Sequence, residues 1–342
     1  ATPESEPHII GVRHNRIAHL PLMQSVENTR AVASYIKDGD YEAAVAARGT
    51  SFSQMLQIFE NMSTPPSQSR HDDSPVKDKR VAILHAGGLA PGMNTAARAA
   101  VRLGIDHGLT MLGIEGGFPG LLNGAVKELS WADVEGWVGE GGAALGTHRE
   151  YPSIEQLYSI GRSLESNHID GLIVIGGFNA YLGAHTLIKE RDRYPAFNIP
   201  IVCVPASIDN NLPGSELSIG ADTAVNSTVS TLDAIKLSAS ASKRCFVAEV
   251  MGRRCGYLTL MSGLAAGAEK VYLPEHDANL NEIASATSDM VNSFRDGRRL
   301  YLVLRNEAAC GLYSTKLLAD IFAQESHGLY DVRESVIGHV QQ

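Results

Sequence analysis

The pattern of hydrophobic and polar positions divides this chain into two parts. Residues 9–22 alternate in a way that predicts two strands around a His-Asn turn. Helices are expected at about 23–38 and 40–60, with Asp40 placed to cap the second. Residues 62–79 carry Pro, Ser and charge without an apolar period, which is typical of a linker. The residues ahead of this linker are too few to build a sheet of their own.

After the linker, short apolar runs alternate with amphipathic segments. The expected strands are 80–87, 110–115, 171–177, 199–205, 245–251 and 299–307. The expected helices are 93–107, 131–140, 153–168, 179–193, 221–239, 279–295 and 314–326. This alternation predicts an α/β fold of doubly wound, mostly parallel sheets with helices on both faces, in which ligands bind beyond the carboxyl ends of the strands. The pattern predicts further elements after 342, so we expect the fold to be incomplete at its C-terminal end.

Composition narrows the function classes. A content of 44% hydrophobic and only 6% aromatic residues with 33 Gly is typical of parallel α/β proteins. The net charge of −9 argues against nucleic acid as a partner, and no apolar run is long enough to span a membrane. Cys203, Cys245, Cys255 and Cys310 lack metal-ligand spacing, which favours free thiols and a reducing compartment, so we expect a cytoplasmic protein.

Polar residues gather just after the predicted strands. The first such segment, GGLAPGMN (87–94), supplies Gly87, Gly88 and Gly92, which let backbone amides approach an anion at a helix N-terminus. It matches neither a P-loop nor the dinucleotide fingerprint. GGFNA (176–180), PASIDNNLPGSELSIGADTA (205–224) and EVMGRRCGYL (249–258) also follow predicted strands. To these we add GTHRE (146–150), KRC (243–245) and VRESVIGHVQQ (332–342).

Together these segments predict a site for a phosphorylated sugar, because Arg forks bind phosphate and carboxylates accept hydrogen bonds from hydroxyl groups. The cationic or imidazole side chains are Arg149, Lys243, Arg244, Arg253, Arg333 and His339. The hydroxyl, amide or acid partners are Ser207, Asp209, Asn211 and Glu307. The alternative is that each Arg is a solvated surface residue, which is the better interpretation of any one of them alone.

In this order, over residues 80–342, the motifs resemble ATP-dependent 6-phosphofructokinase. The best matches are GGxAPGMN, PASIDN…IGADTA, EVMGRRCGYL, the Glu at 307 and VxGHVQ. The layout is similar to the duplicated eukaryotic enzymes, with a fungal-type enzyme expected. The resemblance implies that residues 1–61 are the tail of a preceding N-terminal half, 62–79 the connector, and 80–342 most of a C-terminal half with two α/β subdomains.

The resemblance also implies roles for individual residues. The sugar-phosphate pocket would be lined by Arg149, Ser207, Asn211, Arg244, Met251, Gly252, Arg253, Glu307, Arg333 and His339. Arg244 and Arg333 stand where a neighbouring subunit or half reaches across in the family. Arg98, Arg102 and Lys236 resemble the cations of a nucleotide-effector site, or else they belong to a salt-bridged helix face, and both interpretations stay open.

The chain departs from the family where the nucleotide and metal would bind. Active members carry a Mg²⁺-binding Asp where this chain has Phe178, and the Asp expected in the first Gly loop is Leu89. Asn211 replaces the second Asp of the family motif, and Gln342 stands where catalytic halves carry an Arg. Asp209, at the position of the proton-abstracting base, remains.

The resemblance therefore implies a regulatory half that binds fructose 2,6-bisphosphate and no metal, with Mg²⁺ and ATP used in the other half. The expected partners are fructose phosphates, the N-terminal catalytic half and further subunits of an oligomer, with neither nucleic acid nor membrane. One alternative is a catalytically competent kinase half in which Asp209 is the general base. The absence of GxGxxG and of its acidic ribose partner argues against a nicotinamide oxidoreductase.

Overall fold

The computed structural model describes residues 7–13, 16–63, 78–239, 242–253, 255–276, 278–309 and 311–342. The chain divides into two compact units, residues 1–73 and 74–342, which are described separately below. The predicted turn at His14 and Asn15, Cys310 and most of the predicted linker lie outside the described residues.

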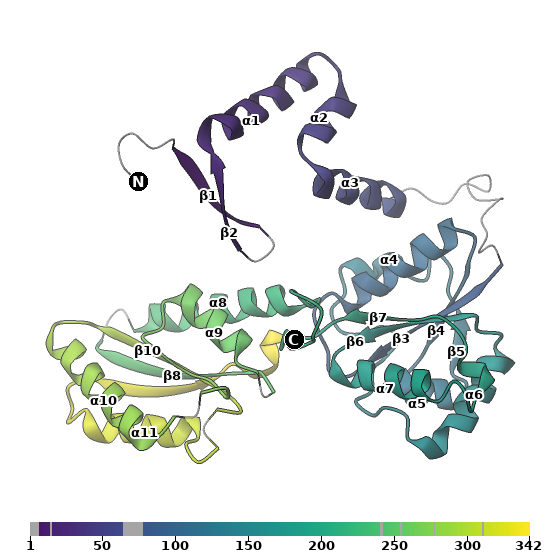
Figure 1. Ribbon diagram of the computed structural model, residues 1–342. Helices are drawn as coiled ribbons and strands as arrows, with labels where there is room; N and C mark the ends of the chain where they lie inside the picture. The colour runs from purple at the N-terminus through teal and green to yellow at the C-terminus, as the bar shows by residue number, and fades with distance from the viewer. Residues whose placement is uncertain are drawn as a thin grey trace. The chain divides into compact units, whose positions relative to one another are not determined.

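The first unit begins with the two predicted strands, β1 (His8–Arg13) and β2 (Arg16–Pro21), which pair antiparallel. Helices α1 (Leu22–Lys37), α2 (Tyr41–Ala47) and α3 (Thr50–Ser63) follow (Figure 1). Asp40 caps α2 as predicted, because its Oδ1 accepts a hydrogen bond of 3.0 Å from the Ala43 amide. The single helix expected at 40–60 is wrong: Gly49, with φ of +94°, separates α2 from α3.

This first unit has almost no core of its own. Among its described hydrophobic residues only Val32 and Ala44 are buried. Its exposed large hydrophobic residues are Ile9, Ile10, Ile17, Leu20, Leu22, Met23, Tyr35, Ile36, Tyr41, Phe52, Met55, Ile58 and Phe59. Exposed apolar area of this extent is typical of surfaces that pack against other protein.

The second unit contains two sheets, and the first has five strands in the order β5-β4-β3-β6-β7. They are β3 (Arg80–Ala86), β4 (Thr110–Ile114), β5 (Val126–Glu128), β6 (Gly171–Gly176) and β7 (Ile201–Pro205). All neighbours are parallel except the β4–β5 pair. The helices are α4 (Met93–Asp106), α5 (Gly117–Leu122), α6 (Leu157–Ser166) and α7 (Phe178–Lys189).

Helices cover both faces of this sheet, as the doubly wound prediction requires. Met93 of α4 packs with Ile83 of β3 in one hydrophobic cluster. Phe118 of α5 and Leu157 of α6 pack with Leu84 of the same strand in another. The successive residues Ile83 and Leu84 of β3 therefore point to opposite faces of the sheet, which confirms the predicted strand at 80–87.

The second sheet has four parallel strands in the order β11-β8-β10-β9. They are β8 (Arg244–Val250), β9 (Lys270–Tyr272), β10 (Leu300–Asn306) and β11 (Asp331–Val336). Helices α8 (Ala221–Ser238) and α9 (Tyr257–Ala266) lie on one side and α10 (Leu280–Arg295) and α11 (Thr315–Glu325) on the other (Figure 1). The predicted fold class is thereby confirmed in both sheets.

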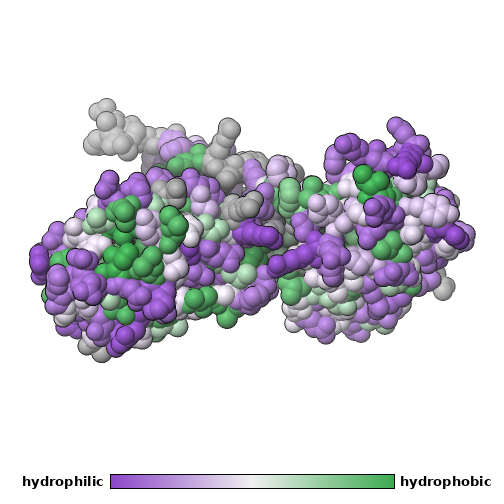
Figure 2. All heavy atoms as spheres, turned by 90° about the horizontal axis from the view of Figure 1, so that it is seen from below, coloured by the Kyte–Doolittle hydropathy of each residue, from purple (hydrophilic) through white to green (hydrophobic). Residues whose placement is uncertain are grey.

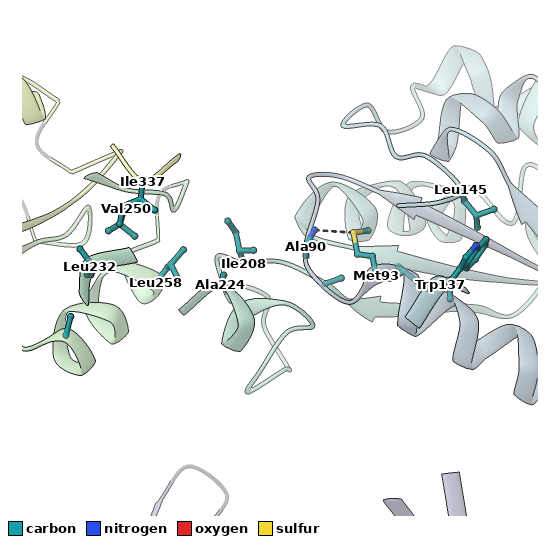
Figure 3. Close-up of a cluster of buried hydrophobic side chains, with 14 of the residues drawn as sticks. Ala90, Met93, Trp137, Leu145, Ile208, Ala224, Leu232, Val250, Leu258 and Ile337 are labelled. Carbon is teal, nitrogen blue, oxygen red and sulfur yellow. Dashed lines mark hydrogen bonds between the residues drawn. The ribbon is translucent and has the colours of Figure 1, made fainter. Parts of the chain in front are cut away.

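One buried hydrophobic cluster includes residues from both sheets of this unit (Figure 3). Trp137 and Leu145 belong to the side of the first sheet, whereas Val250 ends β8 and Ile337 follows β11 of the second. Ile208, from the segment after β7, lies in the same cluster. The shared core brings strand ends of the two sheets into one compact unit.

Several predicted elements differ from the structure. The helix expected at 131–140 is only a 3₁₀ turn, η1 (Glu135–Val138), and the helix expected from 153 begins as a second one, η2 (Ile154–Gln156). Further 3₁₀ turns are η3 (Pro195–Phe197) and η4 (Gly338–Gln341). The sequence prediction missed α5, β5, α9, β9 and β11.

The side of the molecule drawn in Figure 2 is mainly hydrophilic with separate hydrophobic patches, and among the described residues no helix is long and apolar enough to cross a membrane. Cys203, Cys245 and Cys255 are free thiols as predicted, although only Cys245 is fully buried.

Candidate functional site

The carboxyl ends of β3, β6 and β7 meet at one edge of the first sheet. A Cβ atom added to Gly87 would lie 3.6 Å from the Gly177 amide nitrogen, and one added to Gly177 would lie 3.8 Å from Ser207 Oγ. A Cβ added to Gly88 would lie 4.0 Å from a guanidinium nitrogen of Arg149. The structure thus brings the predicted Gly loop together with Ser207 and Arg149.

The segment that carries Arg149 is held by backbone-directed hydrogen bonds. Thr147 Oγ1 donates to the Gly87 carbonyl over 3.0 Å, and the Gly87 amide donates to the His148 carbonyl over 2.8 Å. Asn179 Nδ2 donates to the carbonyl of Arg149 over 2.5 Å. Among the contacts of the described residues, residue 149 takes part through its carbonyl, so its exposed side chain is available to an anion.

A second group of predicted residues lies after β8 and β10. The Gly252 amide donates to Glu307 Oε1 over 3.1 Å, and the Glu307 amide donates to the Val250 carbonyl over 2.9 Å. Gly252 has φ of +146°, and a Cβ there would lie 2.5 Å from Asn306 Nδ2. Only Gly fits this position, so the loop after β8 is closely packed against the end of β10.

Asp209 lies between the two groups. Cys255 Sγ donates to its carbonyl over 3.1 Å, and the Arg253 backbone amide lies near its carboxylate. Burial raises the pKa of Asp209 to about 6; the Arg253 amide opposes the shift and the charge of Glu307 adds to it. Asp209 therefore joins the loop after β7 in the first sheet to the loop after β8 in the second.

The side chains at the expected nucleotide and metal positions do not fit Mg²⁺. Phe178, the first residue of α7, is 58% exposed at the edge where the Gly loops meet. Leu89 is half-buried and Asn211 is exposed. Mg²⁺ requires hard oxygen ligands, and no cluster of three His, Cys, Asp or Glu side chains occurs within the described ranges.

Two of the predicted arginines lie away from this site. Arg244 begins β8, whereas Met251 follows the end of that strand, so roughly 20 Å of strand separates them. Arg333 is exposed on β11 in register with Phe246, near the same starting end. His339 is exposed in η4, on the carboxyl side of β11. The arginines at 244 and 333 consequently do not join Arg253 within this chain.

The three predicted effector cations have different surroundings. Arg102 of α4 is 6% exposed, its guanidinium lies 4.4 Å from the Trp131 ring centroid, and its pKa is lowered by burial and by the charge of Arg98. Lys236 lies on α8, where it pairs with Asp233 over 2.6 Å and donates to a backbone carbonyl of α9 over 2.9 Å. Lys236 thus has the contacts of a salt-bridged helix face.

Sequence reasoning did not single out three residues that support the site. Cys255 contacts Asp209, Gln341 contacts the Met251 amide, and Arg305 holds the loop after β10 through the carbonyls of Ala309 and Tyr313. The motif VxGHVQ includes Gln341, but nothing in its sequence distinguishes a buried amide from an exposed one.

A doubly wound α/β protein with paired Gly turns, an exposed Arg and carboxylates at its strand ends belongs to the class that binds phosphorylated small molecules. Comparison with known families gives the particular one. The model described as Phosphofructokinase matches residues 80–342, and the chain belongs to this family. The family predicted from the motifs is confirmed.

Relatives of this chain carry the same description. It is 41% identical over its whole length to the platelet-type ATP-dependent 6-phosphofructokinase of Rattus norvegicus, of which it covers 43%. It is 40% identical, again over its whole length, to the alpha subunit of the Saccharomyces cerevisiae enzyme, of which it covers 35%. The chain thus spans less than half the length of these relatives.

Solved structures give the same result. The phosphofructokinase structure from Saccharomyces cerevisiae matches with a TM-score of 0.91 at 37% identity, over 100% of this chain and 46% of that chain. The Pichia pastoris phosphofructokinase in the T-state matches with a TM-score of 0.92 at 33% identity, over 100% of this chain and 39% of that chain.

Proposed function

We propose that this chain is part of an ATP-dependent 6-phosphofructokinase, a phosphotransferase that makes fructose 1,6-bisphosphate from fructose 6-phosphate and ATP in glycolysis. Residues 80–342 are its regulatory half and bind fructose 2,6-bisphosphate in a former active site. The observation that supports this proposal is that some functional side chains at the strand ends are kept while others are replaced. The sugar-directed groups remain, whereas Leu89 and Phe178 occupy the nucleotide and metal positions.

The proposed pocket combines groups from both sheets. Ser207, Arg253 and Glu307 lie in the segments after β7, β8 and β10, and Arg149 lies near Gly88 after β3. Met251 and Gly252 precede Arg253 in the loop after β8. Two phosphate groups call for several cations, and Arg149 and Arg253 are both exposed. Asn211 and His339 are further ligands in this proposal, and Arg244 and Arg333 complete the pocket of a neighbouring subunit or half.

The first unit fits the same proposal. Residues 1–61 are the tail of the preceding catalytic half, and residues 62–79 connect the halves. The exposed apolar side chains of α1 and α3 are then covered by the rest of that half. Mg²⁺ and ATP are used there, in an oligomer located in the cytoplasm. The role of Arg98, Arg102 and Lys236 at a nucleotide-effector site stays a prediction.

Titration of the intact protein tests the proposal. Fructose 2,6-bisphosphate is expected to raise the melting temperature in a concentration-dependent way, because a ligand stabilises the state that it binds. Arg149→Ala is expected to weaken this binding about 10- to 100-fold, the effect of losing a charge-assisted hydrogen bond. Phe178→Asp should leave it unchanged. Arg162→Ala, at an exposed position of α6, is the matched control. Unchanged affinity in Arg149→Ala would refute the regulatory assignment.

One observation favours a catalytically competent half instead. Asp209 has a pKa raised to about 6 and lies at the position of the base. Under this alternative, Asp209→Asn should remove the part of the turnover that this half supplies. Under the regulatory proposal, kcat at saturating fructose 6-phosphate and Mg-ATP stays within about twofold of the unmodified enzyme, since a lone carboxylate without metal ligands does not catalyse phosphoryl transfer.

A further inference from the structure

The 3₁₀ turn η4 carries a buried amide directly behind the proposed pocket. Gln341 is 0% exposed, whereas His339 of the same turn faces solvent. Gln341 Oε1 accepts a hydrogen bond of 2.9 Å from the Met251 amide, and its Nε2 donates to Thr228 Oγ1 over 2.8 Å. One side chain therefore links the end of β11, the loop after β8 and helix α8.

The hydrogen-bond pattern fixes the direction of this link. Thr228 is 0% exposed and donates its hydroxyl proton to the Ala224 carbonyl over 2.7 Å, so its oxygen is left as an acceptor for Gln341. A flipped amide would place the Gln341 NH₂ group against the Met251 N–H, donor against donor. The contacts therefore select one orientation of Gln341 and hold it from both sides.

The loop at residues 251–253 is here called the sugar-phosphate loop. Two of its neighbouring amides are bound by side chains of different character. The Met251 amide is bound by the buried, uncharged Gln341. The Gly252 amide is bound by Glu307, which is exposed and charged and is itself a proposed ligand. A ligand hydroxyl that engages Glu307 competes with the Gly252 contact but does not reach the Gln341 contact.

We infer that Gln341 is a positioning residue for sugar-bisphosphate binding. Its hydrogen bonds to the Met251 amide and to Thr228 fix the sugar-phosphate loop relative to the turn that carries His339. The inference rests on the proposed function of the pocket. Gln341 does not touch the ligand. It keeps the Met251–Arg253 backbone in place while Glu307 changes partners, so that less ordering is needed when the sugar bisphosphate binds.

Variants of the intact protein test this inference. Gln341→Leu removes both hydrogen bonds at similar volume and is expected to weaken fructose 2,6-bisphosphate binding roughly 10-fold, as measured by calorimetry. Thr228→Val removes the acceptor behind Gln341 and should weaken binding by a smaller factor. Thr228→Ser keeps the hydroxyl group and should restore affinity. In Gln341→Leu the amide hydrogen of Met251 should also exchange with solvent faster than in the unmodified protein.

Thr287→Val is the matched control. Thr287 is also a buried helical Thr that donates to the carbonyl four residues earlier over 2.7 Å, but it lies on α10 and has no contact with η4 among those described. The inference is overturned if Gln341→Leu and Thr287→Val lower the melting temperature alike while ligand affinity stays unchanged in both. That pattern would mean that Gln341 serves folding alone.

The failure of the proposed function has a different signature. If the unmodified protein shows no response to fructose 2,6-bisphosphate, the regulatory proposal fails. Met251 amide exchange then still decides what Gln341 does. Faster exchange in Gln341→Leu, but not in Thr287→Val, supports a loop-positioning role, and equal exchange in the two variants rejects it.

Discussion

His85 illustrates at the scale of single residues how burial sets a pH dependence. It lies on β3 and is 0% exposed, and this burial lowers its pKa from 6.5 to about 4. The unfolded chain therefore binds a proton at His85 near pH 6.5, whereas the folded protein binds it only near pH 4. The contribution of His85 to stability is fully present above pH 6.5 and is lost as the pH falls toward 4, by roughly 3 kcal/mol at most.

Urea unfolding at pH 8, 6 and 5 measures this contribution. His85→Leu is expected to show a smaller loss of unfolding free energy between pH 8 and 5 than the unmodified protein. An equal loss in both proteins would mean that His85 is protonated in the folded state or that a neighbouring group stabilises its charged form.

Asp209 has the opposite pH dependence. Its pKa is raised from 3.8 to about 6, so the folded protein binds a proton at Asp209 before the unfolded chain does. Its buried charge is destabilising above pH 6, and this penalty disappears as the pH falls toward 3.8. Asp209→Asn is therefore expected to raise the unfolding free energy at pH 8 by roughly 1–3 kcal/mol and to have less effect at pH 5. A destabilised Asn variant at pH 8 would show that the Arg253 amide requires a full negative charge.

The residues of the candidate site differ in how far sequence can predict them. Gly252 could be predicted as a special backbone position, because a motif Gly at a strand end signals unusual backbone geometry. Glu307 lies at the end of a strand that alternation locates, whereas Arg149 follows no strand directly and alternation does not locate it. Gln341 and Cys255 could not be predicted, because their roles depend on partners 90 and 46 residues away in sequence.

At the scale of elements, the pairing of β8 with β10 contains an ion pair between a buried Arg305 and a half-buried Glu249. Arg305 is 5% exposed and donates to Glu249 of the adjacent strand over 2.9 Å, with further bonds to Thr315 and to the loop after β10. Arg305→Met is expected to lower the unfolding free energy by roughly 2–4 kcal/mol, because it removes the hydrogen bonds of a buried guanidinium and leaves the half-buried charge of Glu249 without its cation.

The exposed pair on α11 is the control for this prediction. Lys316 lies 3.3 Å from Asp320, and both side chains are more than half exposed, so Lys316→Met should change stability by less than about 0.5 kcal/mol. Both variants are compared by urea unfolding. Similar small losses would contradict the view that Arg305 holds the end of β10 through its charge.

Elements with a clear period were predictable and the others were not. Helix α4 and strand β6 were predicted almost to their ends, because one has an amphipathic pattern and the other is a short apolar run. Helix α9 was missed because its sequence, YLTLMSGLAA, is apolar nearly all around and contains Gly263. Strand β11, DVRESV, was missed because an edge strand carries charged residues.

At the scale of the whole molecule, strand–helix alternation predicts the fold class but not the strand order. The same alternation of helices and short apolar runs leads to β6, which joins the first sheet, and to β8, which joins the second. Which strands pair depends on contacts between distant residues, and a local pattern does not record them. The resemblance to a known family, rather than the alternation, predicted two subdomains.

The uneven distribution of buried residues between the two units gives the last prediction. Residues 78–342 contain the three hydrophobic clusters, whereas the first unit buries only Val32 and Ala44 among its described hydrophobic residues. A protein of residues 78–342 is expected to unfold cooperatively in urea, because burial of apolar surface is what offsets the loss of chain entropy.

The comparison with this protein uses residues 7–63 produced alone. Without a core, this segment should show no cooperative transition and should bind a hydrophobic dye, since the apolar side chains of α3, such as Phe52, Met55 and Phe59, face solvent. A sharp transition for residues 7–63, with a denaturant slope typical of a folded domain, would show that the unit folds without cover. It would then be an independent domain, and its proposed place as the tail of a preceding half would be wrong.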